Sequence, residues 1–497
     1  MGQRRDDEQP AGLDGRPVVV VGLGVTGQSV VQVLAGRGMS VTAVDSRDDA
    51  ERHDLATRLR RDGVRVRLGP AELGPEARLP PDVGLVVTSP GLRPDTPLLA
   101  TALAAGVEVI GDVELAWRLR PALGTGGRQQ WLAVTGTNGK TTTVRMLAAM
   151  LAAAGHRGAA AGNVGVPILA VVTDPEPYPV VAVELSSFQL YWSTTIAPLA
   201  ATVLNVAAHH LDWHDDLESY AAAKARIFAP GTVAVCNADD PRTVAMADAA
   251  VARTPGPAAR KVAFGLRPPR PGELGVADGW LVDRAFCGAA AVRLAPVRDV
   301  RPAAPHNVAD ALAAAALARA YGDEPATIAA GLAAFVPEPH RIEVVAERAG
   351  VAFVDDSKAS NPAAAAASLA AFPAIVWIAG GLFRGSDADL DALVVAAAPR
   401  LRAAVLIGTD AARFGRALAR HAPDVPVTEL ASTDTGVMDL ATAEAAAAAR
   451  PGDTVLLAPA AQSWDMFRDY QARGDAFAAA VRRLSDHADR RDHRETR

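Results

Sequence analysis

The chain has 497 residues, and at about 150 residues per domain this length predicts roughly three domains. Half of the residues are hydrophobic, 21% are charged and 5% are aromatic, which excludes wholesale disorder and fits a globular protein with large cores. The 50 basic and 56 acidic residues give a net charge of −6, so we expect no nucleic-acid-binding surface.

The composition also bears on the compartment. Cys236 and Cys287 cannot build a disulfide framework or a zinc site by themselves, so a reducing cytoplasm fits best. We expect no membrane insertion, because no apolar run reaches the roughly 18 residues of a spanning helix, and no signal peptide, because the N-terminus lacks an apolar core. The charged segments 1–15 and 485–497 are predicted to be disordered tails.

Three cycles of alternating strand and helix patterns follow one another along the chain. The first has an apolar run, a Gly-rich turn, a helical stretch and a second apolar run, which together predict a βαβ unit. The second opens at residue 131 and contains a Pro- and Gly-rich loop or hairpin at 266–280, and the third follows residues 336–341. Further strands are predicted near 85–91, 107–112, 180–185, 201–206, 232–236, 351–354, 374–379, 403–407 and 453–457.

The sequence therefore predicts an α/β protein with three consecutive domains. They are a Rossmann-like N-terminal domain (16–112), a central mononucleotide-binding domain of the P-loop type (113–337) and a Rossmann-like C-terminal domain (338–484). No fixed-period repeat is present, so a solenoid is not expected.

The first candidate site is the glycine-rich turn Gly22-Leu-Gly24-Val-Thr-Gly27, with Asp45 at the end of the next strand. Such a turn lets a diphosphate approach the backbone N–H groups at a helix N-terminus. Taken alone, it fits a dinucleotide site with Asp45 on the ribose hydroxyls, and a merely tight turn is the simpler alternative. A phosphate-bearing ligand is favoured, and its identity stays open.

The second candidate is sharper, because Thr135-Gly136-Thr137-Asn138-Gly139-Lys140-Thr141-Thr142 follows an apolar strand and opens a helix. Backbone N–H groups of such a loop cradle phosphates, Lys140 can reach the outer phosphates, and Thr141 can offer a hydroxyl to Mg²⁺. Val134 stands where the full Walker pattern has glycine. We nevertheless expect this domain to bind a nucleoside triphosphate.

Glu184 ends another strand and is a natural Mg²⁺ ligand beside a phosphate loop, whereas a solvated strand-end carboxylate is the alternative. The segment from Asn205 holds His209, His210 and His214, whose spacing supports one His ligand beside Mg²⁺ better than zinc, or simply surface histidines. Lys224 lies in a helical pattern and, from its pattern alone, is a solvated surface lysine.

A last group of polar residues follows strands of the third cycle. It consists of Pro339-His340-Arg341, Asp355-Asp356-Ser357-Lys358-Ala-Ser360-Asn361, Gly380-Gly381-Leu-Phe-Arg384, and Ser463 to Tyr470. The carboxyl ends of strands are the ligand face of an α/β sheet, which favours a site over turn chemistry or, for Ser463, helix capping.

Taken together, these motifs resemble the Mur ligase family, which builds the peptide stem of bacterial cell-wall precursors. The resemblance runs from about residue 16 to 485, and within the family the chain looks most like the member that joins D-glutamate to UDP-N-acetylmuramoyl-L-alanine. It is carried, in the family's order, by GLGVTG with VDSR, SPG, TGTNGKTTT, ELSSFQL, NV..HHLD, YAAAKARIF, PHN, PHRIEVV, DDSKASN and SWDMF..Y..RG.

The resemblance implies a role for each matching residue. The uridine diphosphate substrate would be held by Val25, Thr26, Asp45, Ser46, Arg47, Ser89, Pro90, Gly91, Asn163 and His210. ATP would be bound by residues 135–142 together with Asn307, Arg341 and Asp356. D-glutamate would be received by Lys358, Ser360, Arg384, Ser463 and Tyr470.

The resemblance also implies two Mg²⁺ ions, one at Thr141 and a second at Glu184, His210 and Lys224. Lys224 would be a carbamate, which reverses its interpretation as a surface lysine, and Lys140, Lys224, His210 and Glu184 would form the catalytic set. His209 departs from an acidic residue in the family, Arg384 from a lysine of some members, and Gln462 and Trp464 flank Ser463 atypically.

The expected reaction is ATP-dependent amide formation through an acyl phosphate, by an enzyme expected to be monomeric. Three alternatives remain. A nicotinamide-dependent dehydrogenase would explain the first glycine-rich turn but not the phosphate loop. A sister ligase would use another amino acid or a folate-like acceptor. A non-catalytic nucleotide-binding protein would not need Lys140, Glu184, His210 and Lys224 together.

Overall fold

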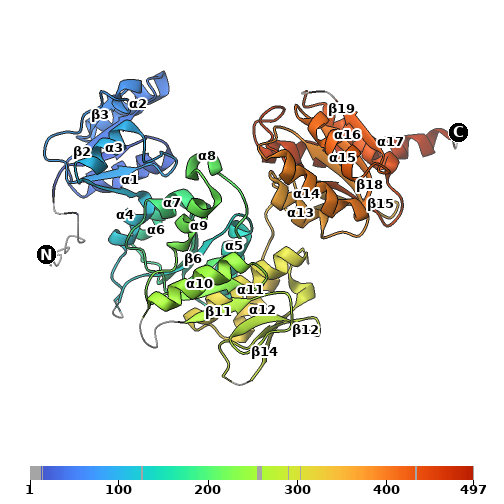
Figure 1. Ribbon diagram of the computed structural model, residues 1–497, viewed down its shortest axis with the longest axis horizontal. Helices are drawn as coiled ribbons and strands as arrows, with labels where there is room; N and C mark the ends of the chain where they lie inside the picture. Colours follow the sequence, from blue (N-terminus) through green and yellow to red (C-terminus); the bar gives the residue numbers. More distant parts are fainter. Residues whose placement is uncertain are drawn as a thin grey trace. The chain divides into compact units, whose positions relative to one another are not determined.

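The computed structural model describes residue 13, residues 15–124, 127–254, 260–288, 290–302 and 304–430, residue 432 and residues 434–495, with side chains up to residue 484. The chain divides into two compact units (Figure 1). Unit 1 comprises residues up to 299 together with 309–335, and unit 2 comprises residues 300–308 together with those from 336 onward.

Unit 1 begins with an open parallel sheet of the Rossmann type. Its order is β3-β2-β1-β4-β5, with strands Arg65–Leu68, Val41–Asp45, Val18–Val21, Leu85–Thr88 and Glu108–Gly111. Helices α1 (Val25–Gly36) and α2 (Ala50–Arg61) pack on one face and α3 (Pro97–Ala104) on the other. The strands are continuous apolar runs because both faces of the sheet are covered.

The second sheet of unit 1 has nine strands. Its order is β14-β13-β12-β11-β10-β9-β6-β8-β7, with strands Val292–Pro296, Trp280–Asp283, Glu273–Ala277, Lys261–Phe264, Val233–Asn237, Ala200–Val203, Gln130–Thr135, Val180–Glu184 and Gly158–Gly162. Strands β6 to β12 run parallel to one another, and β13 and β14 are added antiparallel at one edge. The segment predicted as a loop or hairpin at 266–280 contains β12 and enters β13 through Asp278 and Gly279, both at positive φ, as a tight hairpin turn requires.

Helices surround this second sheet. They are α5 (Lys140–Ala153), α6 (Ile168–Val172), α7 (Ser187–Tyr191), α8 (Leu211–His214), α9 (Leu217–Ala225), α10 (Pro241–Arg253), α11 (Pro305–Tyr321) and α12 (Pro325–Ala334). The helix predicted from the phosphate loop to about residue 154 is α5, and Gly155 follows it at a φ of 81°.

A buried carboxylate joins the two sheets of unit 1. Glu114, in helix α4 (Asp112–Leu119), is fully buried and accepts hydrogen bonds of 2.9 Å from the backbone N–H groups of Thr194 and Thr195. Arg118 of the same helix donates to the other oxygen at 2.9 Å. Because a buried charge must be satisfied, this contact ties α4 to the loop between α7 and β9.

Unit 2 contains a six-stranded sheet of order β15-β16-β20-β17-β18-β19. The strands are Glu343–Arg348, Val351–Asp355, Thr454–Leu457, Ile375–Gly380, Leu401–Ile407 and Val427–Leu430, and only β15 is antiparallel to its neighbour. Helices α13 (Pro362–Leu369), α14 (Asp387–Ala397) and α15 (Ala411–His421) cover one face, and α16 (Val437–Ala448) and α17 (Tyr470–Glu495) cover the other.

The three predicted α/β cycles are therefore confirmed, and the strands that the sequence did not reveal lie mostly at sheet edges. Strands β3, β7 and β19 are edge strands, and β7 reads Gly-Ala-Ala-Ala-Gly. An edge strand has a neighbour on one side, so it needs no continuous apolar run.

Most of the predicted N-terminal tail lies outside the described residues. Leu13, which is described, packs into the core of unit 1. The backbone of α17 continues past residue 484 to Glu495, and residues 496 and 497 lie outside the described part.

Candidate active site

The phosphate loop connects β6 to the first turn of α5, as predicted. Gly139 caps the helix at a φ of 83°, and a Cβ atom there would lie 2.3 Å from Oδ1 of Asp310, so the position requires glycine. The Nζ atom of Lys140 folds back onto the loop and donates to the carbonyl oxygens of Gly136 and Thr137, at 3.0 Å each. The lysine ammonium is thus held against the loop by two of the loop's own carbonyl oxygens.

Asn205, at the end of β9, fixes the shape of this loop. Its Oδ1 accepts from the N–H of Asn138 at 2.9 Å, its Nδ2 donates to the carbonyl of Asn138 at 3.1 Å, and its own carbonyl accepts from the N–H of Thr137. The sequence pattern marks Asn205 as the start of the histidine segment and predicts no role for it. Its signal was its place after an apolar strand beside the loop.

Lys224 is buried, with 1% of its surface exposed, so the pattern-based interpretation as a surface lysine is wrong. Its Nζ donates to the carbonyl of Gly136 at 2.8 Å and lies 3.4 Å from Oγ1 of Thr135. Burial, followed by the nearby charge of Lys140, lowers the pKa of Lys224 well below its ordinary value, although Glu184 opposes the shift. A lysine in this environment tends toward the neutral, nucleophilic amine.

Glu184 ends β8, the strand next to β6, and is 2% exposed. Its Oε1 accepts a hydrogen bond of 2.9 Å from Nδ2 of Asn163, whereas its Oε2 is buried without a hydrogen-bond partner among the described residues. An orphaned buried carboxylate oxygen beside a phosphate loop fits a hard divalent cation. The carboxyl group of Glu184 therefore suits a Mg²⁺ site at the carboxyl end of β8.

The three histidines after β9 have different surroundings. The ring centres of His209 and His210 lie 3.8 Å apart, and His210 is the N-cap residue before α8, at a φ of 55°. Burial, with smaller contributions from His210, Lys140 and Lys224, lowers the pKa of His209 to about 3, so its ring is neutral and can act as a ligand. His214 is buried, and its Nε2 lies 2.9 Å from Oγ of Ser187.

Asp45 fixes the backbone of the first glycine-rich turn through hydrogen bonds. Its Oδ2 accepts from the N–H of Leu23 at 2.6 Å and its Oδ1 from the N–H of Arg47 at 2.8 Å, so both oxygens hold the backbone of the two loops. A Cβ atom on Gly22 would lie 2.4 Å from Oγ of Ser89, which brings the loop after β4 against this turn. Val25 is 78% exposed at the start of α1.

The loop after β4 also reaches the histidine segment. The carbonyl of Gly91 accepts from Nε1 of Trp213 at 3.0 Å, and Arg93 donates to the carbonyls of Asp212 and Trp213 at 2.6 and 2.9 Å. Within unit 1, the loop with the sequence Ser89-Pro90-Gly91 is therefore connected to the segment of His210.

The remaining candidate residues lie in unit 2. Asn307 donates to the carbonyl of Pro302 at 3.1 Å, and Nε of Arg341 donates to Glu338 at 2.8 Å. Asp356 is 7% exposed, and burial raises its pKa to about 6, against the opposing effects of a hydrogen bond from Ser368 and the charge of Arg341.

The five residues expected to receive D-glutamate lie on loops after three neighbouring strands of unit 2, β16, β17 and β20, and at the start of α17. Nζ of Lys358 lies 3.8 Å from the centre of the Tyr470 ring. Leu382 and Gln462 exchange two backbone hydrogen bonds of 3.0 Å, which join the loop of Arg384 to that of Ser463. Ser463 is buried, and Trp464 beside it is 63% exposed.

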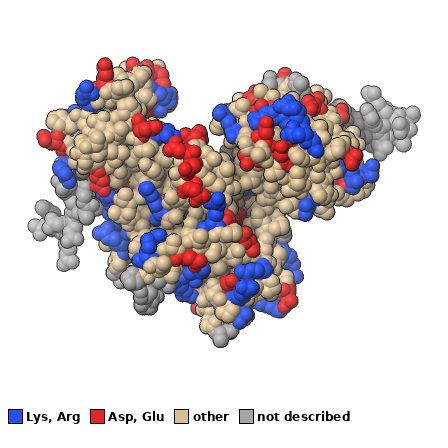
Figure 2. Space-filling model, viewed as in Figure 1, with Lys and Arg blue, Asp and Glu red and all other residues tan. Residues whose placement is uncertain are grey.

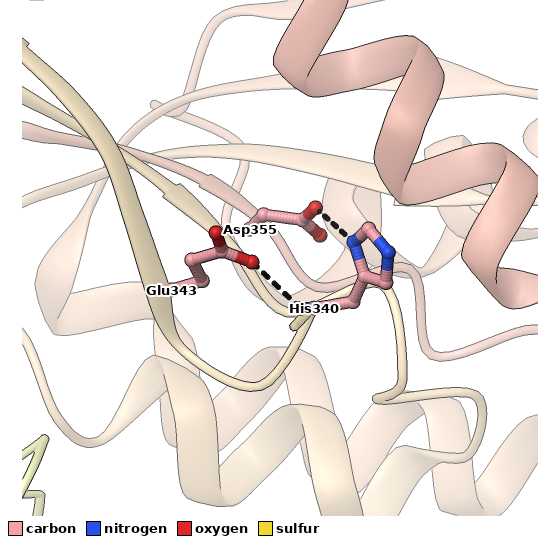
Figure 3. Close-up of side chains that lie close together, drawn as sticks. All are labelled: His340, Glu343 and Asp355. Atoms are coloured by element: carbon pink, nitrogen blue, oxygen red, sulfur yellow. Dashed lines mark hydrogen bonds and ion pairs between the residues drawn. The ribbon is translucent and has the colours of Figure 1, made fainter. Parts of the chain in front are cut away.

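Figure 3 shows His340 directed toward Asp355, with Glu343 beside them. This is the one group among the described residues with three or more His, Cys, Asp or Glu ligand atoms within 4.8 Å of one another. The carboxylates are engaged within the protein: Asp355 accepts from His340 and from the N–H of Ser357, and Glu343 accepts from the N–H of His340. The group therefore acts as a structural junction beside Arg341 and Asp356.

Comparison with known families agrees with this architecture. The model described as "Mur ligase MurD-like, N-terminal domain" matches residues 16–111, "Mur ligase middle domain" matches 134–266, and "Mur ligase, glutamate ligase domain" matches 340–461. Among solved structures, the chain resembles a pseudomurein peptide ligase type C from Methanothermus fervidus, with a TM-score of 0.55 and 17% identity over 94% of this chain and all of that one. It likewise resembles a UDP-N-acetylmuramate-alanine ligase from Thermotoga maritima, with a TM-score of 0.51 and 18% identity over 95% of this chain and all of that one.

Fold and site together define a three-domain α/β protein whose central domain carries a glycine-rich loop between β6 and α5. Curated relatives are much more similar in sequence than these structures. The UDP-N-acetylmuramoylalanine--D-glutamate ligase of Thermobifida fusca is 55% identical over 95% of this chain and 99% of its own length, and that of Streptomyces coelicolor is 53% identical over 96% and 99%. The chain belongs to the Mur ligase family.

Proposed function

We propose that this protein is the ATP-dependent ligase that joins D-glutamate to UDP-N-acetylmuramoyl-L-alanine, a step of peptidoglycan precursor synthesis. The observation that carries the proposal is likeness along almost the whole chain, at 53–55% identity, to relatives named for this activity. The convergence of Lys140, Glu184 and Lys224 at one edge of the central sheet supports a working active site.

The reaction is amide formation, and a carboxylate must first be activated because oxide is a poor leaving group. The carboxylate of the L-alanyl group attacks the γ-phosphorus of ATP, the bond to the bridging oxygen of ADP breaks, and an acyl phosphate forms. The amine of D-glutamate then attacks the acyl carbon, its proton passes to solvent, and phosphate leaves from the tetrahedral intermediate.

Residues of the central sheet supply charge stabilisation to the first step. Lys140 is held by its own loop in a position to meet phosphate oxygens, and the N–H groups at the start of α5 face the same space. Thr141 would bind one Mg²⁺ ion, and Glu184, His210 and Lys224 a second. When bound, these ions neutralise charge on the transferring phosphoryl group.

Lys224 would join this set as a carbamate. A neutral lysine amine attacks carbon dioxide, an N–C bond forms, and a proton leaves to solvent. The lowered pKa of Lys224 favours the amine that this step needs, and the negative product suits a site with the cationic Lys140 nearby. The carbamate oxygens would then face the same cation as the orphaned Oε2 of Glu184.

The outer domains would bind the other substrates. The UDP moiety is assigned to Val25, Thr26, Asp45, Ser46, Arg47, Ser89, Pro90 and Gly91, with Asn163 and His210 on the muramoyl part. In unit 2, Asn307, Arg341 and Asp356 are assigned to the nucleotide, and Lys358, Ser360, Arg384, Ser463 and Tyr470 to D-glutamate. We propose that the three domains span residues 16–112, 113–337 and 338–484.

No helix among the described residues is long and apolar enough to cross a membrane. We propose that the enzyme works in the cytoplasm, where a reducing environment suits its two free cysteines, and that it is a monomer. Sedimentation of the purified chain, alone and with its substrates, tests the monomeric state.

The deciding experiment measures phosphate release with ATP, Mg²⁺ and UDP-N-acetylmuramoyl-L-alanine, with D-glutamate added or omitted. We expect release that requires D-glutamate and is absent with L-glutamate and other amino acids. Release with a different amino acid would assign another substrate to the same chemistry. If folded protein that still binds ATP releases no phosphate with any amino acid, the result would support a non-catalytic nucleotide-binding role.

A further inference from the structure

A guanidinium group lies fully buried in unit 2, outside the residues assigned above. Arg473, in the first turn of α17, has 0% of its surface exposed. Its Nε donates to Oγ of Ser357 at 3.0 Å, its Nη2 to the carbonyl of Ser357 at 2.8 Å and its Nη1 to the carbonyl of Ala461 at 3.0 Å. All three acceptors are neutral, so this cation is held by backbone and hydroxyl oxygens.

Burying a charge is costly, which makes the position informative. Burial lowers the pKa of Arg473 to about 10, with Asp465 and Asp355 close enough to oppose the shift, so the group is still a cation at neutral pH. A lysine could not replace it, because its single ammonium lacks the planar fork that reaches two separate loops.

Arg473 bonds the loops that follow two adjacent strands and lies against the loop that follows a third. Ser357 follows β16 and Ala461 follows β20, and a Cβ atom on Gly381, after β17, would lie 3.4 Å from its Nη1. The carboxyl ends of parallel strands in an α/β sheet form its ligand face. Arg473 therefore lies among the loops that form the ligand face of this sheet.

The same three loops carry the residues assigned to D-glutamate. Lys358 and Ser360 come one and three residues after Ser357, Ser463 comes two residues after Ala461, and Arg384 comes three residues after Gly381. The hydroxyl of Ser357 also donates to the carbonyl of Tyr470 at 2.8 Å. Arg473 is thus bonded to residues that lie one to three positions from Lys358, Ser360 and Ser463.

We propose that Arg473 is a positioning residue for the amino-acid substrate: its guanidinium sets the spacing of the three loops that bind D-glutamate. Because the side chain is fully buried, it acts through the loops without touching the substrate. This inference rests on the proposed function, since it concerns the same pocket. It predicts a larger effect on D-glutamate than on the UDP-linked substrate or on ATP, for which Asp356 is the one assigned residue next to Ser357.

The test compares the full-length wild type with Arg473→Lys, which keeps the charge and loses the fork. We expect the KM for D-glutamate to rise by about 10- to 100-fold, because displacement of binding groups by about 1 Å costs this much. The kcat and the KM values for ATP and UDP-N-acetylmuramoyl-L-alanine should change much less. The matched control is Arg483→Lys, in the same helix, where an exposed arginine pairs with Asp439; its KM values should equal those of the wild type.

A lower unfolding temperature of Arg473→Lys with an unchanged KM for D-glutamate would overturn the proposal, because the residue would then be purely structural. If Arg473→Lys does not fold, Ser357→Ala decides instead, since it removes one acceptor of the guanidinium and no volume beyond an oxygen. Its KM for D-glutamate should rise at least about threefold, and an unchanged KM would again refute the inference. Ser193→Ala, a buried serine of unit 1, is its control.

The two proposals fail differently. If the wild type releases no phosphate with D-glutamate, the proposed function is wrong. If the wild type uses D-glutamate and both variants retain its KM, the function stands and the positioning role of Arg473 is wrong.

Discussion

Nδ1 of His340 lies 2.7 Å from Oδ2 of Asp355, and both side chains are buried in unit 2 (Figure 3). His340 adopts a φ of 62°, and a Cβ atom on Gly474 would lie 2.1 Å from its Nδ1. The pair therefore needs a glycine in α17 and an unusual backbone at the histidine. It fixes the chain next to Arg341 and Asp356, the residues assigned to the nucleotide.

This pair predicts a pH-dependent stability. The hydrogen bond of Asp355 raises the pKa of His340, with burial opposing. A raised pKa in the folded state means that the stabilisation is complete below the unfolded value of about 6.5 and is lost as pH rises through the folded value. His340→Asn, which tolerates the positive φ, should destabilise unit 2 by about 1–3 kcal/mol at pH 6 and by less at pH 9.

Thermal unfolding of wild type and variant across this pH range measures the difference. His53→Asn is the control, because His53 pairs with Asp48 on the surface, at 60% and 53% side-chain exposure. Its unfolding temperature should follow the wild type at every pH. A difference in unfolding temperature between the wild type and His340→Asn that stays constant with pH, or that grows toward pH 9, would contradict a charged His340–Asp355 pair.

Lys140→Met removes the ammonium held over the phosphate loop. We expect kcat for phosphate release to fall by at least about 10²- to 10³-fold, the usual effect of removing one preorganised donor from a transition state. Lys261→Met, which breaks an exposed ion pair with Asp248, is the control and should keep its rate. Circular dichroism checks that both variants fold, and a folded Lys140→Met enzyme of near-normal rate would remove Lys140 from the mechanism.

Glu184→Gln neutralises the buried carboxylate while preserving its shape. We expect the concentration of Mg²⁺ required for half-maximal rate to rise by about 10- to 100-fold, and binding of Mn²⁺, followed by electron paramagnetic resonance, to weaken in parallel. Glu218→Gln is the control, because Glu218 is exposed and pairs with Arg242. Unaltered Mn²⁺ binding by Glu184→Gln would show that the orphaned oxygen holds no metal.

The carbamate proposed for Lys224 has a spectroscopic test. Wild-type protein supplied with ¹³C-bicarbonate should give a carbamate carbon resonance that is missing in Lys224→Met and present in Lys261→Met. Removing bicarbonate should lower the rate of the wild type, and returning it should restore the rate. A wild type without this resonance, yet fully active, would leave Lys224 as a simple buried amine.

Local patterns in the sequence were sufficient for the three α/β cycles and for the phosphate loop. Buried parallel strands are continuous apolar runs, and the loop from Thr135 to Thr142 carries its own glycines and lysine, so neighbours in sequence determine both. Glu184 could be singled out for the same reason, because it ends such a strand. Edge strands such as β3, β7 and β19 lack that signal, since they pair on one side only.

Only the tertiary structure decided which side chains are buried, since burial depends on segments that lie far apart in the chain. Lys224 has the pattern of a surface helix, and only contact with Gly136, 88 residues away, makes it a buried amine of lowered pKa. The bonds of Arg473 to Ser357, 116 residues away, and of His340 to Asp355 likewise have no local signature. The motifs thus indicate the type of reaction, whereas packing determines the protonation state and the position of each side chain that takes part in it.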